Sequence, residues 1–324
     1  MKGTWPAVVF FALAALGPVV VRDPFLLDGL ILILLWGATA AAWNVAGGYA
    51  GQGSLGHAAF FGLGAYSAAL LGTRWGLSPW IGLLVGAGLA TAFGILIGFL
   101  SNRLRGPYFV LATIAFSQVL LIVASRWRGF TAGSEGIPVP FRPGFWTLGI
   151  TDKRVWVAIV LVLAVVLYLV ELYLERSRRG YQLAAVREDE DAALSLGVPA
   201  LRLKVAAIAA SAALTAVAGA LWAQYVGFVD PFYVFSIDLS LRFALAAILG
   251  GIGTPLGPFL GAALILALET YLRARFGGIG AGLVGIYLII YGAALVVMMR
   301  FAPQGLVPLI GEWLRRRPVA GTSS

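Results

Sequence analysis

Ten apolar runs occupy most of this 324-residue sequence, and many are long enough for a helix to cross a lipid bilayer. A helix rises about 1.5 Å per residue, so roughly 20 apolar residues span the ~30 Å hydrocarbon layer. Hydrophobic residues make up 60% of the chain and charged residues only 11%, whereas soluble domains carry about 25% charged residues. Apolar surface in this excess needs lipid to cover it. The sequence therefore predicts an all-α fold, a polytopic transmembrane helical bundle of about ten spans, within a range of eight to ten. The runs are Trp5–Val21, Phe25–Ala46, His57–Leu71, Pro79–Leu100, Pro107–Ala124, Val155–Leu174, Val205–Val226, Leu239–Ile252, Pro258–Leu272 and Ala281–Met299.

The third, eighth and ninth runs are short, and we expect them to be tilted, half-buried or re-entrant. Backbone that leaves the helical state at membrane depth is tolerated only where protein or a water-filled cavity satisfies its polar groups. The first run follows Lys2 and resembles a signal peptide at first sight, but it is long and no clear cleavage site precedes Arg22. We expect a first span that is retained.

The net charge of +9 comes from basic residues placed between apolar runs rather than along one exposed face. This placement favours contact with anionic lipid headgroups over binding of nucleic acid. Arg176, Arg178 and Arg179 directly follow one run, and Arg300 directly follows the last. Because Lys and Arg mark cytoplasmic loops, residues 175–204 and both termini are expected on the cytoplasmic side of a prokaryotic inner membrane.

The predicted organisation is one transmembrane domain over residues 1–304 and a cytoplasmic tail over residues 305–324. Residues 125–154 are rich in glycine, proline and aromatic residues and are expected to form an irregular outer loop. Residues 175–204 form a cytoplasmic segment, which we call the coupling loop. In the tail, Leu306–Arg317 is predicted to lie in the membrane interface as a helix, followed by disorder.

Two glycine-rich breaks separate neighbouring runs. The first break covers residues 47–56 (GGYAGQGSLG) and the second covers residues 250–258 (GGIGTPLGP). Each opens with a glycine pair at the end of an apolar run and leads into another run. An internal duplication, common in transporters, would explain this likeness, and chance is the alternative in a chain with 42 glycines. Close approach of helices through small residues is a third explanation.

Sites for chemistry within this chain are scarce. None of its three lysines follows a glycine in the order of a phosphate-binding loop, so any ATP would be hydrolysed by another chain. His57 is the sole histidine and there are no cysteines, which removes the usual metal pairs and disulfides. The contiguous acids 188–191 splay around a helix instead of converging. We therefore expect a chain that is not an enzyme and has no metal site and no cofactor of its own.

The coupling loop contains a short predicted helix over residues 188–197. Four acids stand at its positive N-terminal end, and Gly197 with Pro199 marks its end. A helix this short is unstable alone and suits docking into the groove of a partner. A solvated loop is the alternative, and composition alone leaves the two even.

Several stretches carry a resemblance to a known family. The run Asp191-Ala192-Ala193-x-x-x-Gly197 resembles the Glu-Ala-Ala-x-x-x-Gly loop of ATP-binding-cassette importer permeases, with Asp in place of Glu and without the usual apolar-Pro ending. Residues 47–66, with the pattern GGYxGQxSLGHAxFFxLGAY, resemble the signature of the branched-chain amino acid permeases. The extended outer loop favours a LivM-type over a shorter LivH-type subunit. Further matches lie at residues 105–113, 133–137, 178–188 and 250–258.

The resemblance implies an ATP-driven importer of leucine, isoleucine or valine. Its parts would be this permease, a second LivH-type permease, two cytoplasmic ATPases that use ATP and magnesium, and an extracytoplasmic substrate-binding protein. Alternating access would be driven through the coupling loop. Relatives with the same fold carry other amino acids, amides or urea, so the cargo stays open. The implied ATPase-coupling residues are Arg187, Glu188, Asp191, Ala192, Ala193 and Gly197.

Residues in and beside the apolar runs supply candidates for the substrate pathway. A polar group at membrane depth is costly and usually faces a cavity or a partner helix. Interhelical hydrogen bonding is the competing role for the amides and hydroxyls. Glu269 is an acid within the ninth run that could instead pair with Arg273, one helical turn on. The pathway candidates are Asn44, Gly48, Gln52, Ser54, His57, Thr113, Ser117, Gln118 and Gln224.

Two other function classes stay open. A secondary transporter or channel without an ATPase fits the glycine-broken helices equally well, but it leaves the 188–197 helix unexplained. An intramembrane enzyme would need paired acids, a second histidine or a nucleophile motif, and the sequence offers none of these.

Overall fold

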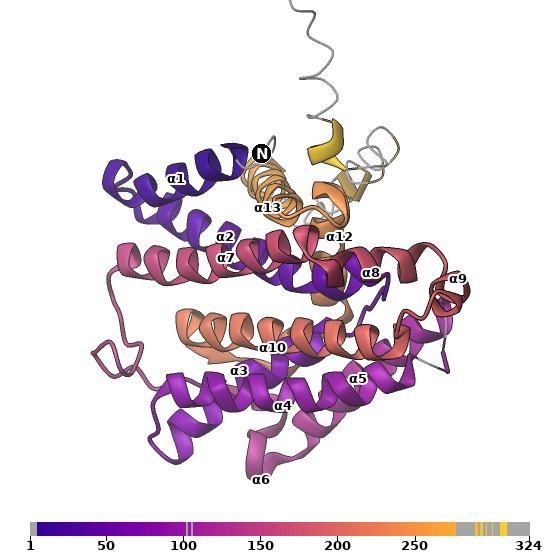
Figure 1. Cartoon of the computed structure of the whole chain (residues 1–324). Coiled ribbons are helices and arrows are strands. Elements are labelled where there is room, and N and C mark those ends of the chain that lie inside the picture. The colour runs from indigo at the N-terminus through magenta and orange to yellow at the C-terminus, as the bar shows by residue number, and fades with distance from the viewer. Residues whose placement is uncertain are drawn as a thin grey trace, which may run out of the picture.

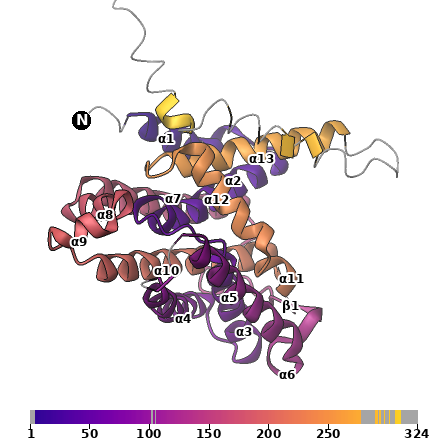
Figure 2. The same cartoon turned by 90° about the vertical axis from the view of Figure 1, so that its right-hand side faces the viewer.

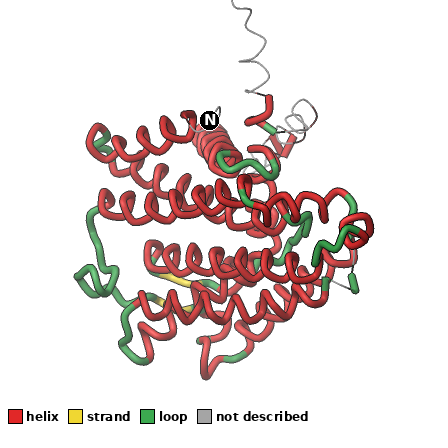
Figure 3. Tube along the Cα trace, in the orientation of Figure 1, coloured by secondary structure: helices red, strands yellow, loops and turns green. Residues whose placement is uncertain are grey.

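The computed structural model describes residues 5–276 except 102 and 105, together with residues 289–290, 292–293, 296, 300 and 305–309. Within these residues the chain is almost wholly helical, which confirms the predicted fold class (Figure 3). The elements are α1 (Trp5–Val20), α2 (Pro24–Asn44), the π-helix η1 (Val45–Tyr49), α3 (His57–Arg74), α4 (Pro79–Leu100), α5 (Pro107–Arg126), α6 (Arg128–Thr131), the 3-10 turn η2 (Gly133–Glu135), β1 (Ile137–Pro138), α7 (Lys153–Arg176), α8 (Arg178–Glu188), α9 (Glu190–Ser195), α10 (Ala200–Val226), β2 (Phe228–Val229), α11 (Pro231–Val234), α12 (Ile237–Gly251) and α13 (Gly257–Phe276).

The helices begin where local capping signals stand in the sequence. Asp23 caps α2 and Ser78 caps α4 through side-chain oxygens, and a proline follows each cap. Asp152 caps α7 by accepting a hydrogen bond from the backbone N–H of Arg154. Short polar segments between the apolar runs therefore fix where these three helices start.

The helices form two layers that meet along α2 and α10 (Figures 1 and 2). One layer contains α3, α4 and α10, and the other contains α2, α7 and α13. Small residues allow the close approach within the first layer: a Cβ added at Gly64 would lie 1.9 Å from the Ala216 carbonyl oxygen, and one at Gly219 would lie 2.1 Å from the Phe61 carbonyl oxygen. Glycine at both positions lets α3 and α10 pack backbone to backbone.

Each of the first nine predicted runs coincides with a helix. Six helical segments in the described part of the chain have the length and hydropathy to cross a membrane, and α1 and residues 257–272 are shorter apolar helices. The helices at the third and ninth runs are longer than the runs themselves. Helix α3 continues beyond its apolar residues to Arg74, and α13 continues to Phe276. Most of the tenth run, residues 281–299, and most of the tail helix, residues 306–317, lie outside the described residues.

The outer loop carries more structure than the irregular cap that the sequence predicts. It contains α6, η2 and β1, and β1 pairs antiparallel with β2 through Ile137 opposite Val229. This pairing joins the loop to the end of α10, a partner that no local pattern reveals. The loop lies at the opposite end of the bundle from α8 and α9 (Figure 1), as expected if one end is external and the other cytoplasmic.

Candidate functional site

The two glycine breaks lie against each other, and Asn44 joins them. Asn44 ends α2 and is fully buried. Its Oδ1 atom accepts a hydrogen bond of 2.9 Å from the backbone N–H of Gly253, and its Nδ2 atom lies 3.4 Å from the carbonyl oxygen of Thr254. Nδ2 also donates a 2.8 Å hydrogen bond to Glu171 Oε1 of α7. One amide therefore holds the first break, the second break and α7 together.

Gly48 lies directly against this amide, where there is no room for a side chain. A Cβ added at Gly48 would lie 1.9 Å from Asn44 Oδ1 and 2.9 Å from the Gly253 nitrogen. Gly253 itself has φ +70°, a conformation that side chains rarely adopt. Close approach of the Asn44 amide thus explains the glycine at position 48, and the positive φ explains the glycine at position 253, whatever the origin of the two similar breaks.

Glu171 is a member of the site that the sequence prediction missed. It is fully buried, and its second carboxyl oxygen, Oε2, has no hydrogen-bond partner among the described residues. The hydroxyl of Tyr49, at the end of η1, is likewise buried without a partner there. An acid inside an apolar run was the available signal, because such groups are costly in membranes and mark functional sites.

The two breaks and α7 meet around Asn44, and we call this meeting point the junction. Arg187 connects the coupling loop to the junction. It lies on α8, and its Nη1 atom donates a 2.9 Å hydrogen bond to the carbonyl oxygen of Gly48. Its Nη2 atom donates to Glu188 Oε1 at 2.9 Å. A Cβ added at Gly51 would lie 2.6 Å from Arg187 Cγ, so the guanidinium stem also packs on the first break. A predicted coupling residue and a predicted pathway residue are therefore bonded directly.

The short helix predicted in the coupling loop is present as α9. Asp189 is its N-cap and accepts a 2.9 Å hydrogen bond from the Ala192 N–H. The chain leaves the helix at Gly197, which has φ +79°. Glu188 differs from the prediction: it ends α8, because the extended Asp189 separates the two helices.

The predicted coupling residues lie on different faces of α9. Ala193 is buried, in a cluster with Val186 and Ala200, whereas Asp191 and Ala192 are exposed. Leu194 is 48% and Leu196 84% exposed. Leu194 on α9 and Leu196 directly after it therefore form an exposed apolar surface, of the kind that the groove of a partner protein covers.

A wide cleft of about 890 Å³ opens beside the junction. One wall is the first break with Gln52, a second is the start of α5 with Phe109, and a third is the coupling loop. Lys204 also lines the cleft and pairs with Glu190 at 2.5 Å. The cleft is polar on the side of the coupling loop, where residues 187–191 line it.

His57 is held as a buried bridge between helices. Its Nδ1 atom lies 3.0 Å from Ser54 Oγ, and its Nε2 atom lies 2.8 Å from Ser211 Oγ of α10. Ser211 in turn donates to the Ala42 carbonyl oxygen at 2.6 Å. His57 is fully buried and is not one of the cleft-lining residues in the described part of the chain. These contacts favour the interhelical role for His57, whereas Ser54 bonds locally, to His57 and to the Gly56 N–H.

Thr113 and Ser117 anchor α5 to its neighbours. Thr113 Oγ1 accepts a 3.2 Å hydrogen bond from the Leu55 N–H of the first break, and Ser117 Oγ donates 3.0 Å to the Phe235 carbonyl oxygen. Gln118 is half-buried on the same helix, and Gln224 is half-buried at the far end of α10. The structure thus gathers most of the pathway candidates around the first break but leaves Gln224 at a distance along α10.

Glu269 has a partner on another helix. Its Oε2 atom accepts a 2.9 Å hydrogen bond from Arg242 Nη1, so α12 and α13 are joined by an ion pair. The side chain of Arg273, the partner expected from spacing along the helix, lies outside the described residues.

Residues 25–299 match a family described as the permease component of the branched-chain amino acid transport system. The chain is 32% identical over 295 residues to the high-affinity branched-chain amino acid transport system permease protein LivM of Escherichia coli, covering 84% of this chain and 67% of that protein. No solved structure matches.

Two further relatives extend the likeness. A probable LivM permease of Methanocaldococcus jannaschii is 24% identical over 272 residues, covering 77% of this chain and 78% of that protein. The LivH permease of Escherichia coli is 29% identical over 210 residues, covering 60% of this chain and 66% of that protein. The match therefore reaches both kinds of permease in one transport system.

Proposed function

Because this chain belongs to the family of branched-chain amino acid transport permeases, we propose that it forms half of the transmembrane pathway of an ATP-driven importer of leucine, isoleucine or valine. It is a multi-pass membrane protein, and we place its coupling loop and both termini on the cytoplasmic side of the inner membrane. The other half of the pathway is a LivH-type permease. Two ATPase chains supply ATP hydrolysis with magnesium, and an extracytoplasmic protein delivers the cargo.

The observation that carries this proposal is the hydrogen bond from Arg187 to Gly48. It joins the segment expected to meet an ATPase to the junction where both glycine breaks and α7 meet. A displacement of α8 would pull directly on the Gly48 carbonyl, and through Asn44 on Gly253. A displacement of α8 that moves both helix breaks together is a way to alternate access between the two sides of a membrane.

The exposed leucines of the coupling loop supply the contact with the ATPase. Leu196 is 84% exposed, at the end of the bundle that we place on the cytoplasmic side. We assign Leu194 and Leu196 to the groove of the ATPase subunit, with α9 as the docking helix.

The test is uptake of radiolabelled leucine by proteoliposomes that contain this chain with the second permease, the ATPases and the binding protein. We expect uptake to require ATP, and Leu196→Asp to release the ATPases during purification in mild detergent. Gly53→Ala is the matched control, since no atom of the described residues lies within 4 Å of a methyl group added there. Uptake without ATPase chains would favour a secondary transporter, and uptake of urea or an amide alone would refute the cargo.

A further inference from the structure

The outer loop, at the end of the bundle opposite α8 and α9 (Figure 1), exposes several aromatic side chains. Phe141, Phe145 and Trp146 are 60%, 57% and 76% exposed. Trp75, in the turn between α3 and α4, is 57% exposed. We call these four residues the aromatic patch. Apolar side chains exposed together in this way mark a surface that contacts a membrane or another protein.

Hydrogen bonds hold the outer loop against the start of α4. Ser78, the N-cap of α4, donates a 2.5 Å hydrogen bond to the carbonyl oxygen of Trp146. Trp80 Nε1 donates a 3.2 Å hydrogen bond to the carbonyl oxygen of Phe145, and the rings of these two residues lie 5.5 Å apart. Leu148, in the same part of the loop, is only 3% exposed. The aromatic side chains therefore stand outward from a loop that is itself held in place.

These contacts place the aromatic patch level with the start of a membrane span. Helix α4, Pro79–Leu100, has the length and hydropathy to cross a membrane. In its first two turns Ile81, Leu84 and Val85 are 45%, 70% and 41% exposed, so the outward face of α4 needs an apolar environment. The patch extends this face beyond the helix start, where hydrocarbon gives way to lipid headgroups. Tryptophan is enriched at that level, because its ring is apolar and its N–H is polar.

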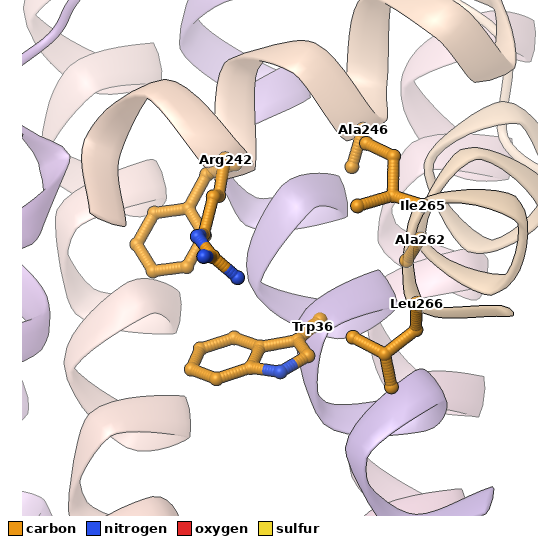
Figure 4. A pocket seen from close by; sticks show the side chains of 7 residues that line it. Trp36, Arg242, Ala246, Ala262, Ile265 and Leu266 are labelled. Carbon is orange, nitrogen blue, oxygen red and sulfur yellow. The ribbon is translucent and has the colours of Figure 1, made fainter. Parts of the chain in front are cut away.

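Arg142, within the exposed part of the loop, supplies a cation. Its guanidinium makes no hydrogen bond or ion pair with the residues that the structure describes. It lies over the α3–α4 turn, since a Cβ added at Gly76 would be 3.5 Å from Arg142 Nη1. Arg242 has a different setting, because its guanidinium points toward the Trp36 ring (Figure 4) and bonds to Glu269. Arg142 is thus placed to bind an anion from outside the chain.

Charge and position together favour a lipid surface as the partner. Residues 72–80 and 139–149, which build the aromatic patch, contain two arginines and no acid, so the complementary charge is negative. We propose that the aromatic patch is a membrane anchor, with its rings at the boundary between acyl chains and headgroups and Arg142 on the phosphate of a phospholipid. The anchor requires a membrane protein but no particular cargo, so it stands apart from the proposed function.

The experiment measures contact with lipid at one labelled position. Since the chain contains no cysteine, Trp146→Cys creates a single attachment site in it for a polarity-sensitive fluorophore. The full chain with its co-purifying subunits is placed in nanodiscs of phosphatidylcholine and phosphatidylglycerol that carry a quencher on the acyl chain close to the headgroup. We expect strong quenching, and weaker quenching when the quencher is moved to the acyl-chain end. The unsubstituted protein, labelled in the same way, gives the background from other subunits.

Glu135→Cys is the matched control, because Glu135 is exposed on the same loop but lies in η2, outside the aromatic patch. Phe141→Cys is a second probe within the patch and should be quenched like the label at position 146. Labels in the patch that are quenched no more than the label at position 135 would overturn the proposal. A label at position 146 that ignores the lipid quencher, but responds to added substrate-binding protein, would assign the patch to protein docking and would also overturn it.

The role of Arg142 is tested by titration of the label at position 146. In detergent micelles, added phosphatidylglycerol should shift the emission of this label. Arg142→Gln should raise the phosphatidylglycerol concentration at the midpoint about fivefold, the share that one basic residue contributes to attraction by an anionic surface. Arg142→Lys keeps the charge and should restore most of the affinity. An unchanged midpoint in Arg142→Gln would show that this arginine does not bind the headgroup.

Discussion

The amide of Asn44 should contribute several kcal/mol to stability, and its removal is the sharpest test of the junction. Asn44→Ala removes the 2.9 Å bond from Gly253 and the 2.8 Å bond to Glu171. Interhelical hydrogen bonds in membrane proteins contribute about 0.6 kcal/mol on average and up to about 1.7. A buried carboxyl and a backbone N–H left without partners add about 1–3 kcal/mol. We expect the free energy of unfolding to fall by about 2–4 kcal/mol.

The assay is equilibrium unfolding of the purified chain in mixed micelles, repeated with Glu171→Leu and with the double variant. Since Asn44 and Glu171 bond directly, the two changes should not be additive, with a coupling energy of about 1–2 kcal/mol. Thr39→Val is the control, because Thr39 is buried on the same helix but, among the described residues, its side chain bonds only within that helix, to the Leu35 carbonyl oxygen. Additive effects, or an Asn44→Ala loss no larger than that of Thr39→Val, would refute the reasoning.

The remaining predictions concern the first glycine break, His57 and α9. Gly48→Ala should abolish uptake, because the added methyl would lie 1.9 Å from an amide oxygen, whereas Gly53→Ala should leave it near native; equal uptake rates in proteoliposomes would contradict the close packing. His57→Leu should lower the melting temperature in detergent, because two buried hydroxyls lose a partner, and an unchanged melting temperature would argue against a bridging role. Ala193→Asp places a charge at a buried position and should speed proteolysis of the coupling loop, whereas Ala192→Asp should leave proteolysis unchanged and weaken co-purification of the ATPase; similar proteolysis of both variants would contradict the assigned faces.

The predictable parts of this fold are those that depend on neighbouring residues. Apolar runs, caps and the glycine end of α9 are local, so the helices fall where the sequence predicts them. Polar residues do not end a helix on their own, which is why α13 continues past its apolar part to Phe276.

The contacts of the junction are long-range, and the sequence alone could not supply them. Asn44 and Gly253 are separated by 209 positions, and Asn44 and Glu171 by 127. The sequence marks Asn44 and both breaks as unusual, but no periodicity says that they touch. Glu171 stands out locally as an acid within an apolar run, but nothing near it in the sequence points to Asn44. Glu269 likewise has a partner, Arg242, on another helix.

The π-helix η1 makes the first break sensitive to chain length as well as to composition. A π turn holds an additional residue compared with an α turn, and such turns are rare outside functional sites. Deleting one residue between Val45 and Tyr49 would let α2 run on as ordinary helix, with every backbone bond still made. Each later residue would then move by one position, about 100° around the axis, and the carbonyl that Arg187 now meets would point elsewhere. A deletion that does little harm to the helix would thereby break the hydrogen bond between Arg187 and the first break.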